Sequence, residues 1–385
     1  MANNKIGKKN ASGHYLSRKE VRAIAKANAK VMRELEAKKF RKCDESEYLT
    51  EMKDPANILE IDSLHSYFFT DQGVVKAVNG VSFEIPAGST VGVVGESGCG
   101  KSVTSMSVMR LLQGPTGQIV EGSIRFRSND GKVYDIAEMP MSEIHRIRGN
   151  QISMIFQEPM TSLNPVFTIG EQLDEVTLIH IPGATKESAK AKSLEMLELV
   201  GIAAPDRVYK SFPHELSGGM RQRVMISMAL ACNPRLIIAD EPTTALDVTI
   251  QAQILDLLRD LKTKINGSIM LITHDLGVIA EMADYVVVMY AGKVIERGTV
   301  SEIFHDPRHP YTIGLQKSKP TMNSDSNTLF NIPGNVPNPV NMPSHCYFKE
   351  RCDRCTAKCS GDYPGMIRVS PTHYVACHLY GKEEE

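Results

Sequence analysis

The sequence predicts an α/β fold built around a largely parallel sheet, because two observations agree. Short apolar segments of strand length alternate with longer segments of helical period along most of the 385 residues, which is the pattern of successive βα units. One of these strands runs directly into a glycine-rich loop and then into a helix. With 42% hydrophobic and 23% charged residues, the chain can bury a full core and is not a wholly disordered protein.

The first 55 residues are expected to form a basic helical extension. Ser17 and Glu20 make a capping-box pattern, which predicts a helix from there to about Lys42 with a weak apolar stripe. Residues 1–42 hold thirteen Lys or Arg against three Glu, a local charge of +10, so the remaining residues carry −11. A basic arm on an acidic body leaves three alternatives: a solvated extension, which we favour, a helix lying on anionic lipid, or an RNA contact.

Residues 56–308 carry the α/β pattern and are predicted to form one domain. The expected helices include Glu187–Val200 and Thr249–Lys264. The expected strands include Val81–Ile85, Thr90–Val94, Ile152–Phe156, Leu236–Ala239, Ile269–Thr273 and Tyr285–Met289. Apolar runs such as Val286–Tyr290 are far shorter than the roughly 20 residues that a membrane-crossing helix needs. We therefore expect a chain that does not cross a membrane by itself.

A phosphate-binding loop is predicted between the strand Thr90–Val94 and the helix after it. The run matches the pattern G-x-x-x-x-G-K-[ST] in the strand–loop–helix context that this pattern requires. Its members are Gly95, Glu96, Ser97, Gly98, Cys99, Gly100, Lys101 and Ser102. Glycines let backbone N–H groups wrap a polyphosphate, Lys101 reaches the β- and γ-phosphates of ATP, and the Ser102 hydroxyl suits Mg²⁺.

Two carboxylates follow the apolar strand Leu236–Ala239. Carboxyl ends of parallel strands meet at the sheet edge where α/β proteins bind ligands. Asp240 is expected to hold Mg²⁺ there, and Glu241 to orient or deprotonate the attacking water. The pattern predicts hydrolysis of ATP.

A second anion-binding turn opens a helix at Ser217, Gly218 and Gly219. One ATP does not need two such turns in one chain. The second turn is therefore expected to bind the γ-phosphate of a nucleotide held by another subunit.

These motifs, in this order, resemble those of ABC-type ATPases over residues 57–308. Leu216–Arg223 resembles the family's signature sequence, while Gln157, residues 245–247 and His274 resemble its Q-loop, D-loop and switch histidine. The resemblance implies a RecA-like P-loop NTPase core with an antiparallel β subdomain, an α-helical signature subdomain and, in this chain, a Cys-rich C-terminal extension.

The resemblance also implies roles for single residues. Gln157 would sense the γ-phosphate and join Ser102 and Asp240 around Mg²⁺, while His274 would act with Glu241 in catalysis. Phe68 would stack on adenine, with Tyr67 as a close competitor. The D-loop residue would be Asp247, and the contacts to the other subunit's ATP would come from Ser217, Gly218, Gly219 and Gln222.

Further segments resemble ATPase subunits of oligopeptide, dipeptide and nickel importers: Met154–Pro165, Phe212–Glu215, Tyr290–Gly298 and His309–Thr312. This resemblance implies a peripheral protein at the cytoplasmic face of the cell membrane. Its partners would be a second, related ATPase subunit, two permease subunits and an extracytoplasmic peptide-binding protein. The basic N-terminal arm departs from the family pattern.

Residues 309–385 form the third predicted region, which is proline-rich and irregular up to Pro343 and then rich in cysteine. Four thiolates with short spacings suit a [4Fe–4S] cluster or tetrahedral Zn²⁺, and reduced or disulfide-linked cysteines are the alternative. Cys346, Cys352, Cys359 and Cys377 match a pattern that holds a [4Fe–4S] cluster in some importer subunits, and Cys355 is a competing ligand.

Two other functions explain part of the sequence. A soluble ABC ATPase acting on nucleic acid, in DNA repair or on the ribosome, would use the basic arm. The single P-loop and the 60 residues from Gln157 to Ser217 argue against it. The presence of Glu241, a residue expected to act in ATP hydrolysis, argues against a regulatory module that only senses ATP. We therefore expect an ATP-hydrolysing importer subunit without a nucleic-acid partner.

Overall fold

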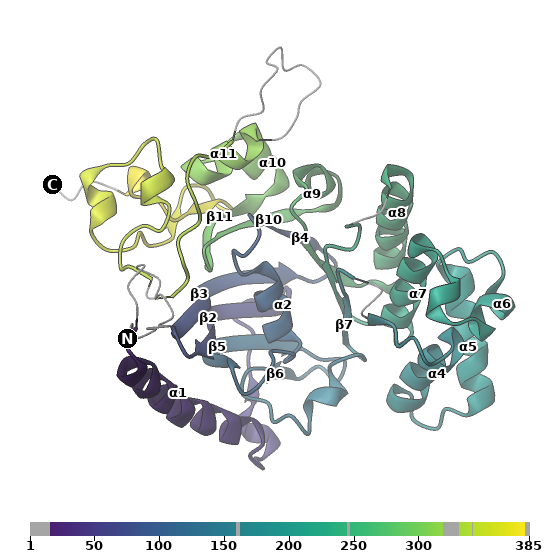
Figure 1. The fold of residues 1–385 in the computed structure, drawn as a ribbon. Coiled ribbons are helices and arrows are strands. Elements are labelled where there is room, and N and C mark those ends of the chain that lie inside the picture. Colours follow the sequence, from purple (N-terminus) through teal and green to yellow (C-terminus); the bar gives the residue numbers. More distant parts are fainter. Residues whose placement is uncertain (1–15, 159–161, 245–246, 319–330, 341, 382–385) are drawn as a thin grey trace, which may run out of the picture.

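Two sheets of different pairing form the frame of the computed structural model, which describes residues 16–158, 162–244, 247–318, 331–340 and 342–381 (Figure 1). The larger sheet has the order β12-β13-β11-β10-β4-β9-β8-β7, and it is parallel from β10 to β7. The prediction of a largely parallel sheet is confirmed. The strands are β4 (Thr90–Val94), β7 (Ile152–Ile155), β8 (Leu236–Asp240), β9 (Ser268–Ile272), β10 (Tyr285–Tyr290), β11 (Lys293–Thr299), β12 (Ile367–Arg368) and β13 (Tyr374–Val375).

The smaller sheet is antiparallel and has the order β1-β6-β5-β2-β3. Its two long strands pair along most of their length and form the antiparallel subdomain that the family resemblance implies. The strands are β1 (Leu49–Thr50), β2 (Asn57–Thr70), β3 (Gly73–Pro86), β5 (Gly117–Arg127) and β6 (Val133–Asp135).

The helices fall into groups with different neighbours (Figure 1). Helix α2 (Lys101–Val108) follows the P-loop and contacts strands of both sheets. A helical subdomain, well apart from the antiparallel sheet, consists of α4 (Ile169–His180), α5 (Lys186–Leu199), α6 (Pro205–Lys210) and α7 (Gly218–Leu230). The remaining helices are α1 (Arg18–Lys39), α8 (Val248–Ile265), α9 (Leu276–Met282), α10 (Val300–His305) and α11 (Pro310–Lys317).

The parallel sheet is buried on both faces, so its strands are mainly apolar. Along β9, Met270 and Ile272 face a core shared with the antiparallel sheet, while Ile269 and Leu271 face a core shared with the helices. This division follows from the period of two in a strand, where successive side chains point to opposite faces. Apart from the buried Ser153 of β7, the polar residues of the parallel strands lie at the strand ends.

The N-terminal extension is docked on the antiparallel sheet, which differs from the solvated arm that we favoured. The predicted capping box at Ser17 is present. Asn28, which interrupts the apolar stripe of the helix, is buried, and its side-chain amide donates to the Thr70 carbonyl over 2.8 Å. Gln118 of β5 donates to Glu36 over 2.6 Å. Polar contacts anchor α1, and apolar periodicity in a sequence does not indicate this kind of packing.

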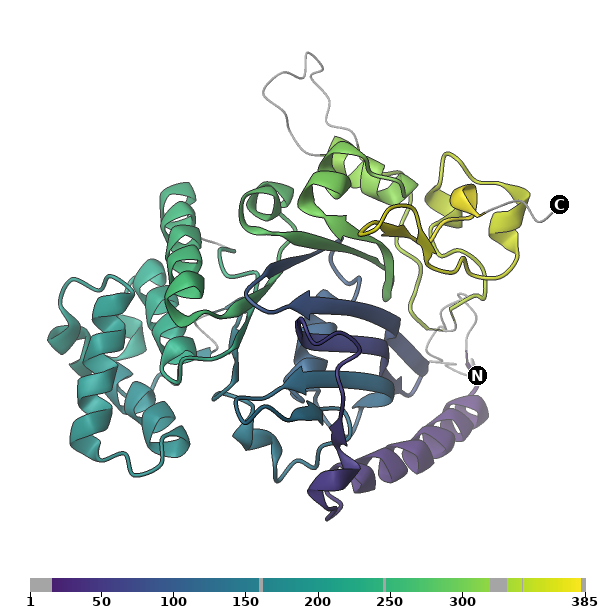
Figure 2. The ribbon, with the colours of Figure 1, turned by 180° about the vertical axis from the view of Figure 1, so that it is seen from behind.

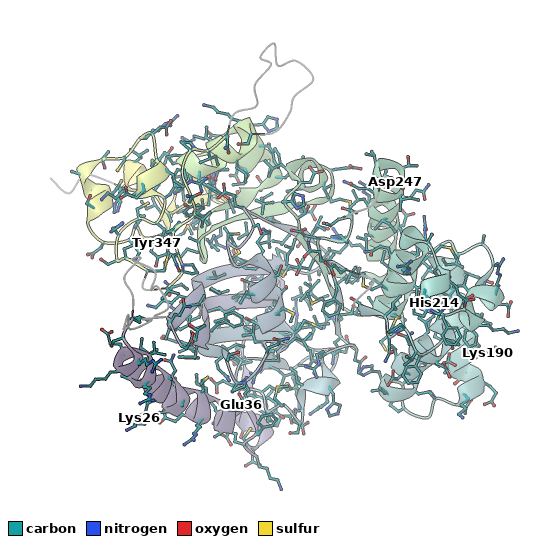
Figure 3. The ribbon with its side chains drawn as sticks, viewed as in Figure 1. Lys26, Glu36, Lys190, His214, Asp247 and Tyr347 are labelled. Atoms are coloured by element: carbon teal, nitrogen blue, oxygen red, sulfur yellow. The ribbon has the colours of Figure 1, made fainter. Side chains whose placement is uncertain are left out.

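Both views show α1 lying along the antiparallel sheet, on the side away from the helical subdomain (Figure 2). Lys26 is exposed on its outer side, and Glu36 lies on the side that faces the sheet (Figure 3). Strand β1, also within residues 1–55, pairs with β6. The described part of the extension is therefore continuous with the ATPase fold.

The C-terminal region extends the large sheet. Strand β13 pairs with β11, and Tyr311 and Phe348 belong to the core on the helical face. None of the helices in the described part of the chain combines the length and apolarity that crossing a bilayer requires.

Replacing Asn28 with Ala should loosen α1, because the Thr70 carbonyl loses its donor at a cost of about 1 kcal/mol. The measurement is amide hydrogen exchange of α1, which should become faster while exchange of the β4 and β9 amides stays unchanged. Lys26→Ala, on the exposed side of the same helix, is the matched control. Equal exchange in the wild-type protein and both variants would contradict the anchoring role of Asn28.

Candidate active site

The P-loop lies between β4 and α2, where its backbone passes close to neighbouring chain segments. Gly95 and Gly100 have φ of +152° and +102°, and a Cβ at these positions would lie 2.2 Å and 2.4 Å from the carbonyl oxygens of Met289 and Ala77. Only glycine combines this backbone conformation with this approach. Lys101 is buried, and its ammonium donates to the Gly95 carbonyl over 2.7 Å. The predicted loop is formed, with its lysine folded onto it.

Two of the three predicted magnesium ligands, Ser102 and Asp240, meet at this loop, whereas the third, Gln157, is hydrogen-bonded to Glu241. The Ser102 hydroxyl donates to a carboxylate oxygen of Asp240 over 3.1 Å, although the two residues are 138 positions apart. Burial raises the pKa of Asp240, and the hydrogen bond from Ser102 and the charge of Lys101 oppose that shift. A hydroxyl and a carboxylate are hard oxygen ligands of the kind that Mg²⁺ prefers. The pair therefore fits Mg²⁺.

Glu241 is the meeting point of the predicted catalytic residues. The Gln157 amide donates to one carboxylate oxygen over 2.9 Å, and His274 Nδ1 lies 3.4 Å from the other. The Thr244 hydroxyl also donates to Glu241 over 2.9 Å. Three elements separated in sequence thus bring four polar side chains together. Thr244 was missed by the sequence analysis, and the only signal for it was a hydroxyl three residues after the carboxylate.

The backbone conformation of Glu241 is unusual and sets the direction of its side chain. Its φ is +47°, a left-handed conformation that residues other than glycine rarely adopt. Its N–H donates to the Ile272 carbonyl over 2.8 Å, which ties the end of β8 to the end of β9. Such strain, of order 1 kcal/mol or more, is typical of functional positions.

The side chains of two P-loop residues predicted to bind nucleotide contact other parts of the protein. The Glu96 N–H donates to the Tyr311 hydroxyl over 2.8 Å, and its carboxylate pairs with Arg351. The Cys99 side chain is buried, and burial raises the pKa of its thiol. Ser97 and Gly98 remain exposed in the loop. Both side chains contact the protein, and the binding of nucleotide by the loop residues Glu96 and Cys99 stays a prediction.

The signature turn is open to solvent at the start of α7. Ser217 caps this helix by accepting a hydrogen bond from Met220 N–H over 3.3 Å, and Ser217 and Gly218 are exposed. Gly219 lies close to Ile250 of α8. Gln222 differs, because it is buried and its amide donates to the Pro242 carbonyl over 2.6 Å. Gln222 thus supports the turn after β8, and its contact with a partner's ATP stays a prediction.

The D-loop aspartate lies beside this open turn. Asp247 is exposed and caps α8 by accepting a hydrogen bond from Ile250 N–H over 3.0 Å (Figure 3). Residues 245–246, the rest of the predicted D-loop, lie outside the described residues, as do residues 159–161 after the Q-loop. Asp247 and the signature turn belong to one exposed region at the starts of α7 and α8.

The two candidate adenine-stacking aromatics occupy different surroundings. Phe68 is half-buried and pairs with Gly117 of β5, whose missing side chain leaves room for the ring. The Tyr67 hydroxyl donates to Asn79 over 2.9 Å. Asn79 N–H in turn donates to Gly292, which hydrogen-bonds the Cys99 carbonyl in the P-loop. Tyr67 is thus the aromatic with a continuous hydrogen-bond path to the P-loop.

The predicted ligand thiols of the tail interact electrostatically. Burial raises the pKa of three of the predicted ligand thiols, and repulsion between the tail thiolates adds to the shift: Cys346, Cys352 and Cys377. The fourth, Cys359, is hydrogen-bonded by Thr356 N–H at 3.5 Å, and despite burial these bonds from Thr356 lower its pKa. All eight cysteines are free thiols.

Thiolates held by backbone N–H groups suit a metal centre, since such groups stabilise the charged sulfur. Within the described ranges, however, no three His, Cys, Asp or Glu side chains are arranged closely enough to hold a metal ion as they stand. Cys355 is exposed and lies next to Cys359.

Two protein-family models match the chain in two separate parts. The model "ABC transporter" matches residues 78–244, which contain the P-loop, Glu241 and the signature turn. The model "Oligopeptide/dipeptide transporter, C-terminal region" matches residues 295–359.

Curated relatives are similar over most of the chain. The oligopeptide transport ATP-binding protein AppD of Bacillus subtilis (strain 168) is 49% identical over 328 residues, which cover 85% of this chain and 98% of the relative. The oligopeptide transport ATP-binding protein OppD of the same organism is 51% identical over 323 residues, covering 84% and 88%. The dipeptide transport ATP-binding protein DppD, also from that strain, is 48% identical over 328 residues, covering 85% and 96%.

Among solved structures, the ATP-binding cassette MJ0796, in a dimeric post-hydrolysis state bound to ADP and Pi, superimposes with a TM-score of 0.55. It is 26% identical and covers 63% of this chain and 98% of its own. Both the ATPase motifs and the C-terminal region thus match a family model, and relatives named for oligopeptide and dipeptide transport match most of the chain. The chain belongs to the ATP-binding proteins of ABC-type oligopeptide and dipeptide transporters.

Proposed function

We propose that this chain is the ATP-hydrolysing subunit of an importer of oligopeptides or dipeptides. The observation that carries the chemistry is the cluster around Glu241, where Gln157, His274 and Thr244 hold one carboxylate next to the P-loop. The relatives named for oligopeptide and dipeptide transport support the cargo class.

The residues divide the work of hydrolysis among them. Backbone N–H groups of the P-loop and the ammonium of Lys101 would bind the phosphates, with Lys101 exchanging its bonds to loop carbonyls for bonds to phosphate. Ser102, Asp240 and, from the Q-loop, Gln157 would hold Mg²⁺, which neutralises phosphate charge. Glu241 would accept the proton of the attacking water, held in orientation by Gln157 and His274.

A second ATPase subunit would complete the site. Ser217, Gly218 and Gly219 form an open helix N-terminus, which attracts anions, and α7 has no acidic residue in its first turn. This turn would contact the γ-phosphate of ATP in the partner, with Asp247 at the same interface. The dimeric state of MJ0796 bound to ADP and Pi supports this arrangement. A related chain, forming a heterodimer, is the partner that we propose.

The membrane part of the importer would come from other chains. We propose two permease subunits and an extracytoplasmic peptide-binding protein as partners, with this chain bound peripherally at the cytoplasmic face. The apolar side chains exposed on the helical subdomain and near the Q-loop support a protein contact on that side, among them Val166, Phe167 and Ile179.

The tail would hold a [4Fe–4S] cluster, with Zn²⁺ as the alternative. The ligands would be Cys346, Cys352, Cys359 and Cys377, whose thiols influence one another and accept backbone hydrogen bonds. A bound metal would then order a region with little regular structure.

Replacing Glu241 with Gln should reduce ATP turnover by roughly 10²-fold or more, since the amide cannot accept the proton of the water. ATP affinity should stay near the wild-type value. The measurements are the ATPase rate of the assembled transporter and binding of a fluorescent ATP analogue to the chain. Lys101→Ala is the contrasting variant, because it should lose nucleotide affinity. Turnover of the Glu241→Gln complex close to the wild-type rate would refute the role of Glu241.

Permease subunits should stimulate the ATPase, whereas duplex DNA and RNA should not. A nucleic-acid enzyme that used the basic α1 would bind phosphates, with affinity falling steeply as salt rises. The measurement is the ATPase rate with and without each partner at two salt concentrations. Stimulation by nucleic acid alone would overturn the importer assignment.

An Fe–S centre predicts a brown protein when the chain is purified without oxygen, with broad absorption near roughly 400 nm from sulfur-to-iron charge transfer. Replacing any of the four ligand cysteines with Ser should remove the colour, and Cys355→Ser should keep it. Stoichiometric zinc in a colourless protein would select the zinc alternative. A chain with neither metal would refute both.

A further inference from the structure

The second residue of the P-loop is held by the C-terminal region through both its backbone and its side chain. The Glu96 N–H donates to the Tyr311 hydroxyl over 2.8 Å. The Glu96 carboxylate accepts two hydrogen bonds from the Arg351 guanidinium, over 2.7 Å and 3.0 Å. A bidentate pair of this kind fixes the orientation of both groups. Glu96 and Arg351 are 255 residues apart.

Arg351 is itself fixed, so it can serve as a rigid support. Its side chain is 5% exposed. Its Nε donates to the Pro333 carbonyl over 3.0 Å and its Nη2 to the Ile332 carbonyl over 3.3 Å. Its guanidinium also lies 5.8 Å from the centre of the Phe348 ring, within cation–π range. The hydrogen bonds to Glu96 raise the pKa of Arg351 above its ordinary value.

Tyr311 is fixed by an aromatic cluster at the end of the parallel sheet. Its ring is fully buried and lies 4.8 Å from the ring of Tyr290 and 5.5 Å from that of Phe348. Tyr290 ends β10, one residue after Met289, whose carbonyl the P-loop passes at Gly95. Strand β10, α11 and the segment before Cys352 therefore converge behind the P-loop; Figure 1 shows the C-terminal region beside β11 and α11.

We propose that Arg351, with Tyr311, positions the P-loop for ATP, so that the C-terminal region sets the nucleotide affinity of the subunit. This inference rests on the P-loop being the ATP site as proposed above. Arg351 does not touch the nucleotide. It acts through Glu96 as a positioning residue.

Two physical effects support this role. A loop already held in its binding conformation loses less conformational freedom when phosphates bind, which strengthens binding. The carboxylate of Glu96 would also repel a polyphosphate if it were unpaired, and Arg351 neutralises it within the fold. Both effects act on ground-state binding, whereas the proton transfer at Glu241 does not involve this pair.

Replacing Arg351 with Met removes the charge and keeps most of the side-chain length. In the full chain, the Kd of a fluorescent ATP analogue should rise about tenfold, a coupling typical of contacting residues. In the assembled transporter, the KM for ATP should rise to a similar extent, with kcat at saturating ATP changed less than about twofold. Arg354→Met, at an exposed arginine three residues further on, is the matched control and should leave both values unchanged.

A double-mutant cycle shows whether the ATP affinity lost in Arg351→Met comes from breaking the pair with Glu96 or from a loss of folding. Adding Glu96→Gln to Arg351→Met removes the unpaired charge, so ATP affinity should recover part of the tenfold loss. Tyr311→Phe keeps the ring in the core and removes only the acceptor for the Glu96 N–H, so affinity should fall by about threefold. Arg351→Lys keeps the charge but not the two parallel hydrogen bonds, so its ATP affinity should lie between those of the wild type and Arg351→Met.

Three outcomes would overturn the inference. They are unchanged ATP affinity in Arg351→Met, a loss in kcat without a change in KM, and a double variant no better than Arg351→Met alone. If the wild-type chain bound no ATP, or if Lys101→Ala bound it normally, the proposed ATP site would fail instead. The two failures are therefore distinguishable.

Discussion

In a parallel sheet, the carboxyl ends of neighbouring strands lie at the same edge, and the active site depends on that constraint. Strands β4, β9 and β8 are neighbours in this order, so the P-loop, His274 and the two carboxylates after β8 emerge side by side. Both faces of these strands are covered, which leaves this edge for polar chemistry. The hydrogen bond from Ser102 to Asp240 and the contacts of Glu241 are consequences of that pairing.

The C-terminal region is part of this frame, although it follows the ATPase motifs in sequence. It adds β13 to the sheet beside β11, places Tyr311 and Phe348 in the core, and reaches the P-loop through Arg351. A buried arginine is costly unless it is paired and its donors are satisfied. Here its carboxylate and carbonyl acceptors come from the P-loop and from residues 332–333. The tail and the nucleotide site are therefore linked through a well-satisfied polar contact.

Polar contacts also attach the N-terminal helix to the rest of the fold. Helix α1 carries exposed lysine and arginine side chains on its outer side, and it is attached by polar contacts to an otherwise acidic protein. Asn28 donates to a backbone carbonyl, and Glu36 accepts from Gln118. Since surface ion pairs contribute little, the buried amide is the more important of these contacts.

The sequence by itself determined the parts whose physics is local. The strands from Thr90–Val94 to Tyr285–Met289 were recognisable because a strand buried on both faces is apolar throughout, and the P-loop because only glycines allow its turns. The order of motifs likewise identified Asp240, Glu241, Gln157 and His274 as one site. Only the tertiary structure decided which side chains of the motifs contact residues that are distant in the sequence. Glu96, Cys99 and Gln222 all lie within or beside motifs. The Glu96 side chain nevertheless pairs with Arg351, the Cys99 side chain is buried in the core, and the Gln222 amide donates to the Pro242 carbonyl. Asn28 of α1 is likewise an isolated polar residue whose partner, the Thr70 carbonyl, lies elsewhere in the chain, and no period or spacing marks such a residue before the chain folds.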